Sequence, residues 1–214
     1  MKKALTVICI LFSIVSNAQN FNPKILALPE NPNIEDFSFF KEEFKDVQVV
    51  MLGEITHFEG NVFEMKTKII KYLHEQMGFN TVAFESGVYD VWKAQIDINK
   101  GYDTKKAFIK SLFTIWAKKN EFQSFIEFYD KNKADLKLYG FDDQLTGQYG
   151  ENEFVNDLYT YCKKNRFKFQ LKQEDLSLLI ESIRVSYVFD EQDISYNQYK
   201  SALTGLLNSI SSKP

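Results

Sequence analysis

The chain has 214 residues, with 26 basic and 29 acidic side chains and a formal net charge of −3. This length allows one domain with at most a small appendage, and the near-balanced charge gives no bulk attraction to a polyanion, so we expect no nucleic-acid partner. Hydrophobic residues make up 44% of the chain and aromatic residues 15%. That composition supplies the apolar area of a packed core and excludes a disordered chain.

Residues 1–18 have the pattern of a secretory signal peptide. Lys2 and Lys3 precede a largely apolar stretch at 4–15, and small residues lead to Ala18. The apolar stretch is about twelve residues long, which is too short to span a bilayer comfortably. We therefore expect an exported protein, periplasmic or extracellular, with no stable membrane span once the signal is cleaved; an N-terminal anchor is the alternative.

The elements that follow alternate between buried-strand and amphipathic-helix patterns. After the signal comes a proline-rich lead-in, residues 19–44, with a short helix predicted at 36–44. Nearly continuous apolar runs predict strands covered on both faces, and stripes spaced by three and four residues predict helices. The predicted strands are 47–52, 81–85 and 136–141, and the predicted helices between them are 61–77, 88–99, 104–117 and 121–133.

This order of strand, helix and strand predicts an α/β fold with a short, mostly parallel sheet flanked by helices. We assign residues 45–150 to this core domain. Residues 151–214 show only helical patterns, at 153–164, 173–189 and 194–209, and form an all-helical C-terminal segment of the same domain.

Acidic side chains follow each of the three predicted strands. Glu54 and His57 come after the first strand, Glu85 ends the second and Asp142 ends the third. Because ligands of open parallel sheets collect at the carboxyl ends of the strands, these four residues are expected to meet at one edge. The alternative is that they are ordinary strand-ending acids, solvated or capping the next helix.

Lys66 stands in an apolar stripe between Val62 and Ile69. A buried ammonium is costly unless it is paired, so a nearby acid is an expected partner, although a lysine can also extend its charged end to solvent at the edge of a stripe. His57 has the side chain suited to general-base chemistry near neutral pH, and a carboxylate three residues before it could fix its tautomer.

Several segments in order resemble the erythromycin esterase family. The residues are Leu52-Gly53-Glu54-Ile55-Thr56-His57-Phe58, then Gly78-Phe79, then Val82-Ala83-Phe84-Glu85; further along come the segment from Trp116 to Glu121 and Leu138-Tyr139-Gly140-Phe141-Asp142. The resemblance covers about residues 45–145. The family carries a further histidine-containing strand that these residues lack, since both histidines precede residue 75, and Lys66 stands where the family usually has an arginine. We therefore expect a site that is incomplete in this chain, which would be either a fragment that lacks a C-terminal half or a shortened relative of the family.

The resemblance implies that His57 is a general base that activates water against an ester or lactone carbonyl. Glu54 and Glu85 would then orient the imidazole, and Lys66 and Asp142 would contact the substrate. No cofactor is expected on this hypothesis. An alternative is a metal-binding or small-molecule-binding exported domain, because Glu54, His57, Glu85 and Asp142 offer ligands that suit a divalent metal.

Overall fold

The computed structural model describes residues 25–54, 56–186 and 196–212. The chain divides into two units, residues 1–32 and 33–214. In the first unit, residues 25–32 form no helix or strand. The predicted signal peptide lies outside the described residues, as do the end of the predicted helix 173–189 and the start of 194–209.

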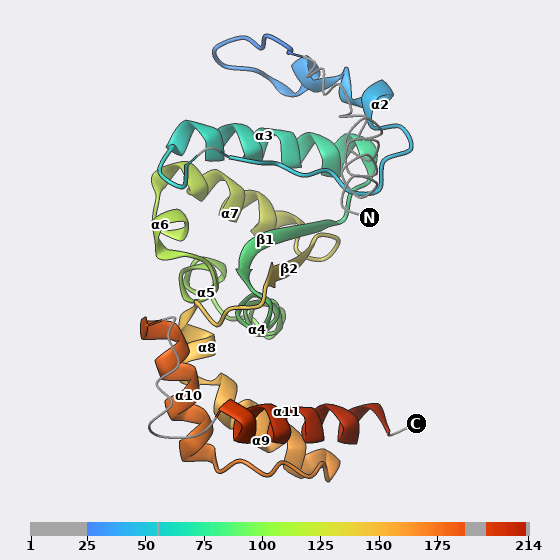
Figure 1. Ribbon diagram of the computed structural model, residues 1–214. Coiled ribbons are helices and arrows are strands. Elements are labelled where there is room, and N and C mark those ends of the chain that lie inside the picture. Colours follow the sequence, from blue (N-terminus) through green and yellow to red (C-terminus); the bar gives the residue numbers. More distant parts are fainter. Residues whose placement is uncertain (1–24, 55, 187–195, 213–214) are drawn as a thin grey trace, which may run out of the picture. The chain divides into compact units, whose positions relative to one another are not determined.

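The second unit is mostly helical, with two strands (Figure 1). Its elements up to the second strand are η1 (Ile34–Phe37), α2 (Phe40–Glu43), α3 (Gly60–Met77), β1 (Thr81–Gly87), α4 (Val88–Asn99), α5 (Thr104–Ser111), α6 (Thr114–Ala117), α7 (Asn120–Asn132) and β2 (Lys137–Asp142). The remaining helices are α8 (Gln148–Asn152), α9 (Phe154–Asn165), α10 (Gln173–Ser186) and α11 (Tyr196–Ser211).

The two strands pair in parallel, with Thr81 opposite Lys137 and Ala83 opposite Tyr139. The connection between them runs through α4, α5, α6 and α7, as a parallel pair requires. The predicted α/β class, a short parallel sheet flanked by helices and followed by an all-helical segment, is confirmed. Alternate residues face opposite sides: Leu138 is buried, whereas the side chains of Tyr139 and Phe141 are 52% and 65% exposed.

The prediction of a strand at 47–52 is wrong. Residues 47–52 have no strand conformation and pair with neither β1 nor β2. Val49 is 72% exposed and Met51 89% exposed, so this apolar run is not covered on both faces. A run of this composition becomes a strand only when a neighbouring strand satisfies its backbone groups, and neither described strand pairs with this run.

The predicted helices 61–77 and 88–99 are confirmed as α3 and α4. α3 ends before Gly78, whose φ of 76° is the left-handed conformation of a helix C-cap, and α4 has the predicted bounds. The predicted helix 104–117 is instead two helices, because the chain is extended at Leu112, a residue that is buried in the core. The predicted helix 36–44 is likewise divided, into η1 and α2.

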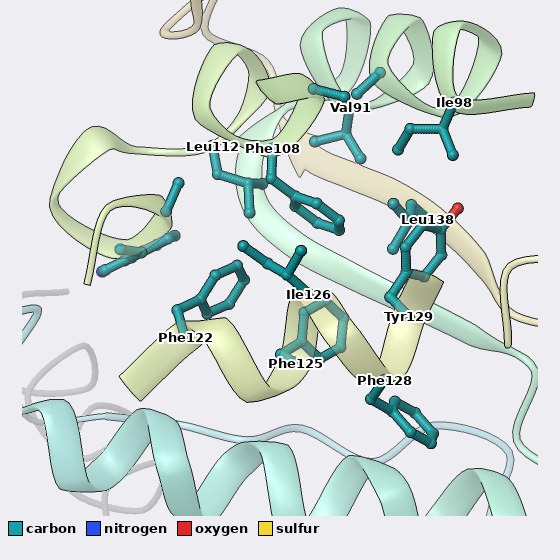
Figure 2. Packing of buried hydrophobic residues seen from close by; sticks show 14 of the residues in the cluster. Val91, Ile98, Phe108, Leu112, Phe122, Phe125, Ile126, Phe128, Tyr129 and Leu138 are labelled. Atoms are coloured by element: carbon teal, nitrogen blue, oxygen red, sulfur yellow. The ribbon is translucent and has the colours of Figure 1, made fainter. Parts of the chain in front are cut away.

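The core is an aromatic cluster between the sheet and the helices (Figure 2). The ring of Phe84 in β1 lies 5.4 Å from that of Phe125 in α7 and 6.3 Å from that of Phe108 in α5. Phe63 joins α3 to the cluster through Phe122, with ring centroids 6.1 Å apart. Edge-to-face pairs of this kind add to the stability that apolar burial already provides.

The C-terminal helices form a second, smaller cluster around Leu171, Leu176 and Ala202. A charged group links α4 to α9, since Lys93 Nζ lies 2.5 Å from Asp157 and 3.0 Å from Glu153. In the part of the chain that the structure describes, none of the helices combines the length and apolarity needed to cross a bilayer.

Phe125→Ala should lower the free energy of unfolding by about 3–5 kcal/mol, because it opens a cavity in the aromatic cluster. Phe141→Ala is the matched control. Its ring is 65% exposed, so the same truncation should cost less than about 1 kcal/mol. Urea unfolding followed by circular dichroism measures both, and similar losses for the two variants would contradict the assignment of the core.

Candidate functional site

Glu54 and His57 lie in the loop that leads into α3. The Nδ1 atom of His57 is 2.5 Å from Oε1 of Glu54. The Glu54 side chain is 11% exposed and that of His57 is 47% exposed, so the carboxylate lies beneath an imidazole that faces solvent. An ionised carboxylate only accepts hydrogen bonds, and we therefore assign the proton to Nδ1. The lone pair is then on Nε2, the nitrogen that a general base uses.

Lys66 holds the other oxygen of the same carboxylate. Its Nζ atom donates to Oε2 of Glu54 at 2.5 Å, and its side chain is only 18% exposed. Lys66 lies in the second turn of α3, above the ring of Phe63 at 5.3 Å from Nζ to the ring centroid. The paired partner expected for a lysine in an apolar stripe is thus present, and Glu54 is that partner.

These contacts set the ionisation of Glu54. Burial of the carboxylate acts to raise its pKa, but the hydrogen bonds from Lys66 and His57, with the charges of both groups, outweigh burial and lower the pKa overall. Glu54 is therefore ionised at neutral pH. An ionised Glu54 keeps the proton of His57 on Nδ1 and stabilises the imidazolium that forms when Nε2 takes up a proton.

The ring of Trp116 packs against one side of the imidazole. The ring of Trp116 in α6 meets that of His57 edge to face, with centroids 5.5 Å apart and planes at 66°. Trp116 itself is 4% exposed and also contacts Phe63 and Phe113. The loop that holds His57 is thus packed against the segment between α5 and α7.

The structure does not bring Glu85 and Asp142 into contact with Glu54 or His57. Glu85 is exposed near the end of β1, and within the described residues its side chain makes no hydrogen bond or ion pair. Asp142 ends β2 and accepts a hydrogen bond from the backbone N–H of Gln144 at 3.0 Å. Both lie toward the carboxyl end of the sheet, where Gly87 is paired with Asp142. Over the described ranges, no three histidine, cysteine or acidic side chains are grouped closely enough to hold a metal ion.

Asp90 is a buried acid that the sequence analysis missed. It is 0% exposed in the first turn of α4, and its carboxylate accepts the backbone N–H groups of Gly147 and Gly150 at 3.1 and 2.7 Å. It thereby fixes the chain that follows β2 against α4. A signal was available, because Asp90, Ala94 and Ile98 share one helical stripe, as Lys66 does with its apolar neighbours.

Comparisons with known proteins find hydrolases. The chain is 34% identical over 120 residues to "Putative hydrolase YbfO" of Bacillus subtilis (strain 168), a match that covers 53% of this chain and 26% of that protein. It is 36% identical over 55 residues to erythromycin esterase type II of Escherichia coli, covering 26% of this chain and 13% of the esterase. No protein-family model matches. The chain is thus distantly similar to hydrolases over part of its length, and its matches span about a quarter or less of each relative.

Solved structures share the fold. A protein from Bacillus cereus matches with a TM-score of 0.50 and 23% identity, over 76% of this chain and 38% of its own. A succinoglycan biosynthesis protein matches with a TM-score of 0.50 and 24% identity, over 90% of this chain and 43% of its own. At this level of identity the likeness concerns the α/β architecture alone.

Lys66→Met should raise the pKa of Glu54, because it removes a hydrogen bond and a positive charge from the carboxylate. It should also lower the free energy of unfolding near neutral pH by about 1–3 kcal/mol. Ionised Glu54 has a lowered pKa in the folded state, so its contribution is full above the ordinary value of 4.5 and is lost as the pH falls through the lower, folded value. The gap between the wild type and Lys66→Met should therefore close in acid.

The matched control is Lys68→Met. Lys68 makes a helical ion pair with Glu64 at 3.3 Å, and its removal should change stability by less than about 0.5 kcal/mol. Carbon-13 titration of the carboxyl groups and urea unfolding between about pH 3 and 7 measure both effects. An unchanged Glu54 titration midpoint in Lys66→Met would contradict the pairing.

Proposed function

We propose that the chain carries part of the active site of an ester or lactone hydrolase, with His57 as its general base. Support comes from the contact between His57 Nδ1 and Glu54, which leaves the lone pair on Nε2 of an imidazole that is 47% exposed. The partial similarity to a hydrolase and to an erythromycin esterase points to the same reaction class.

The proposed reaction begins with a water molecule that donates a hydrogen bond to Nε2 of His57. The water oxygen attacks the carbonyl carbon while its proton passes to Nε2, and the carbonyl electron pair moves to the carbonyl oxygen. Collapse of this intermediate breaks the bond between carbon and the ester oxygen, which takes the proton back from Nε2. The products are a carboxylic acid and an alcohol, and a lactone gives both in one opened molecule.

Glu54 contributes by stabilising the imidazolium, and Lys66 contributes through Glu54. Because Lys66 Nζ is 2.5 Å from Glu54, its charge is already balanced, and its primary role is to keep that carboxylate ionised and in place. Asp142 is proposed to contact a polar group of the substrate from the carboxyl end of the sheet. The family resemblance gives Glu85 the role of a second acid that orients the imidazole, whereas the carboxylate that contacts His57 in this structure is that of Glu54.

The test is a panel of small esters that includes a macrolide lactone, assayed with the wild-type chain, His57→Ala and His74→Gln. His57→Ala should lower kcat/KM by about 10²–10⁴-fold, the usual contribution of a general base. His74 is the matched control, because its Nδ1 lies 2.7 Å from the backbone oxygen of Phe79, away from the site. Its variant should retain most of the activity. Ester hydrolysis that is equal in the wild type and His57→Ala would overturn the proposal, as would failure of every form to hydrolyse an ester, including a form extended by the further histidine-containing strand that the family carries.

Export is part of the proposal, on the basis of the basic, apolar and small-residue order at 1–18. When the full sequence is expressed in a secreting bacterium, the protein recovered outside the cytoplasm should begin at Gln19. Intact-mass measurement and N-terminal sequencing check this. A change of Ala18 to a bulky residue such as Trp should block the cut, because signal cleavage requires a small residue there; recovery of an uncleaved wild type would contradict export by this route.

A further inference from the structure

The segment from Trp116 to Glu121 contacts the loop of Glu54 and His57 at three points. The Trp116 ring meets the His57 ring at 5.5 Å. Lys119 Nζ donates to the backbone oxygen of Phe58 at 2.9 Å. The side chain of Glu121 lies so close to Gly60 that a Cβ there would be 2.5 Å from its carboxyl carbon. The reactions proposed for Glu54 and His57 use none of these contacts.

We propose that Trp116 and Lys119 are positioning residues, which hold the His57 imidazole and its loop so that Nδ1 stays on Glu54 and Nε2 stays available. This inference deepens the proposed function, since it concerns the same imidazole. The sequence of the loop supplies little rigidity of its own, because residues 47–54 and 56–59 form no helix or strand. The imidazole is 47% exposed, and an exposed side chain samples several rotamers unless its neighbours restrict it.

Trp116 is itself firmly held, which lets it act as a fixed surface. Trp116 is 4% exposed. Its ring packs against those of Phe63 and Phe113, with ring centroids 5.5 and 5.1 Å away. Backbone hydrogen bonds from Trp116 to Phe113 and from Lys119 to Trp116, each 2.9 Å long, tie the segment together. The indole N–H makes no hydrogen bond with the described residues, so the contact with His57 is one of ring packing alone.

The side chain of Lys119 holds the backbone of the loop at Phe58, the residue after His57. It lies directly before α7, so its stem begins on an element anchored in the aromatic core. The hydrogen bond to Phe58 fixes the carbonyl adjoining the peptide unit of His57. Its neighbour Lys118 is exposed and makes no such contact with the described residues, so it provides a matched control for a loss of charge.

The experiment is nitrogen-15 NMR of the imidazole rings, because the chain has two histidines and each gives a separate pair of ring nitrogens. The spectra are recorded in alkaline solution, because the two tautomers of a neutral imidazole ring are distinguished by their pair of nitrogen resonances. His57 of the wild type should show the pattern of a proton on Nδ1. In Trp116→Leu the two nitrogen resonances of His57 should converge toward the averaged values of an exposed histidine.

Trp116→Phe should keep the wild-type pattern, since a ring remains and no hydrogen bond is lost. His74 reports on the fold, because its Nδ1 contact with Phe79 does not involve the loop, and its resonances should not change. Lys119→Met should move His57 in the same direction as Trp116→Leu, and Lys118→Met should not. Lys119→Met also decides the question if Trp116→Leu fails to fold, since Lys119 lies outside the buried core.

A wild-type His57 pattern in Trp116→Leu, or in Lys119→Met where the first variant does not fold, would overturn the proposal and leave Trp116 as a core residue only. The readout needs no substrate. Ester hydrolysis that does not depend on His57, together with the expected convergence, would therefore refute the proposed function while leaving the positioning role of Trp116 intact.

Discussion

The packing of Phe84 against rings from two helices is the interaction on which the rest of the structure depends. Its centroid lies 5.4 Å from that of Phe125 and 6.3 Å from that of Phe108, so one residue of β1 fixes both α7 and α5 relative to the sheet. Phe122 continues the cluster to Phe63 in α3. Because α3 carries Lys66, and Trp116 lies between α5 and α7, the aromatic core also determines where the partners of Glu54 and His57 can lie.

Elements that carry their own start and stop signals could be predicted from the sequence. The stripe of α3 and the left-handed Gly78 at its end are local features. The strand β2 was also predicted, but it is covered on one face only, and not on both faces as its apolar run suggested. The run at 47–52 has an equally apolar composition but no partner among the described residues. Its conformation depends on backbone hydrogen bonds from elsewhere, which composition does not encode. Leu112 shows the same limit, since tertiary packing interrupts a stretch that is helical by propensity.

In the candidate site, too, contacts between residues close in sequence could be predicted and contacts between distant residues could not. His57 follows Glu54 by three residues, and Lys66 interrupts an apolar stripe. Local sequence features therefore indicated that each of the two would pair with an acid, which is Glu54 in both cases. Trp116 reaches His57 across 59 positions of the chain, and Asp90 meets Gly150 across 60. Such contacts follow from how helices dock on a sheet, and a single sequence gives no direct measure of that. The expected meeting of Glu85 and Asp142 with His57 required the strand at 47–52.

The reactivity of the Cys162 thiol in α9 reports on local unfolding of the C-terminal helices. Its thiol is 3% exposed, and burial raises its pKa, so both the access and the thiolate that oxidants and alkylating reagents need are suppressed. The thiol becomes reactive only when α9 separates from its neighbours. Its chemical lifetime in an oxidising medium is therefore set by the local unfolding of this region and not by the chemistry of the sulfur.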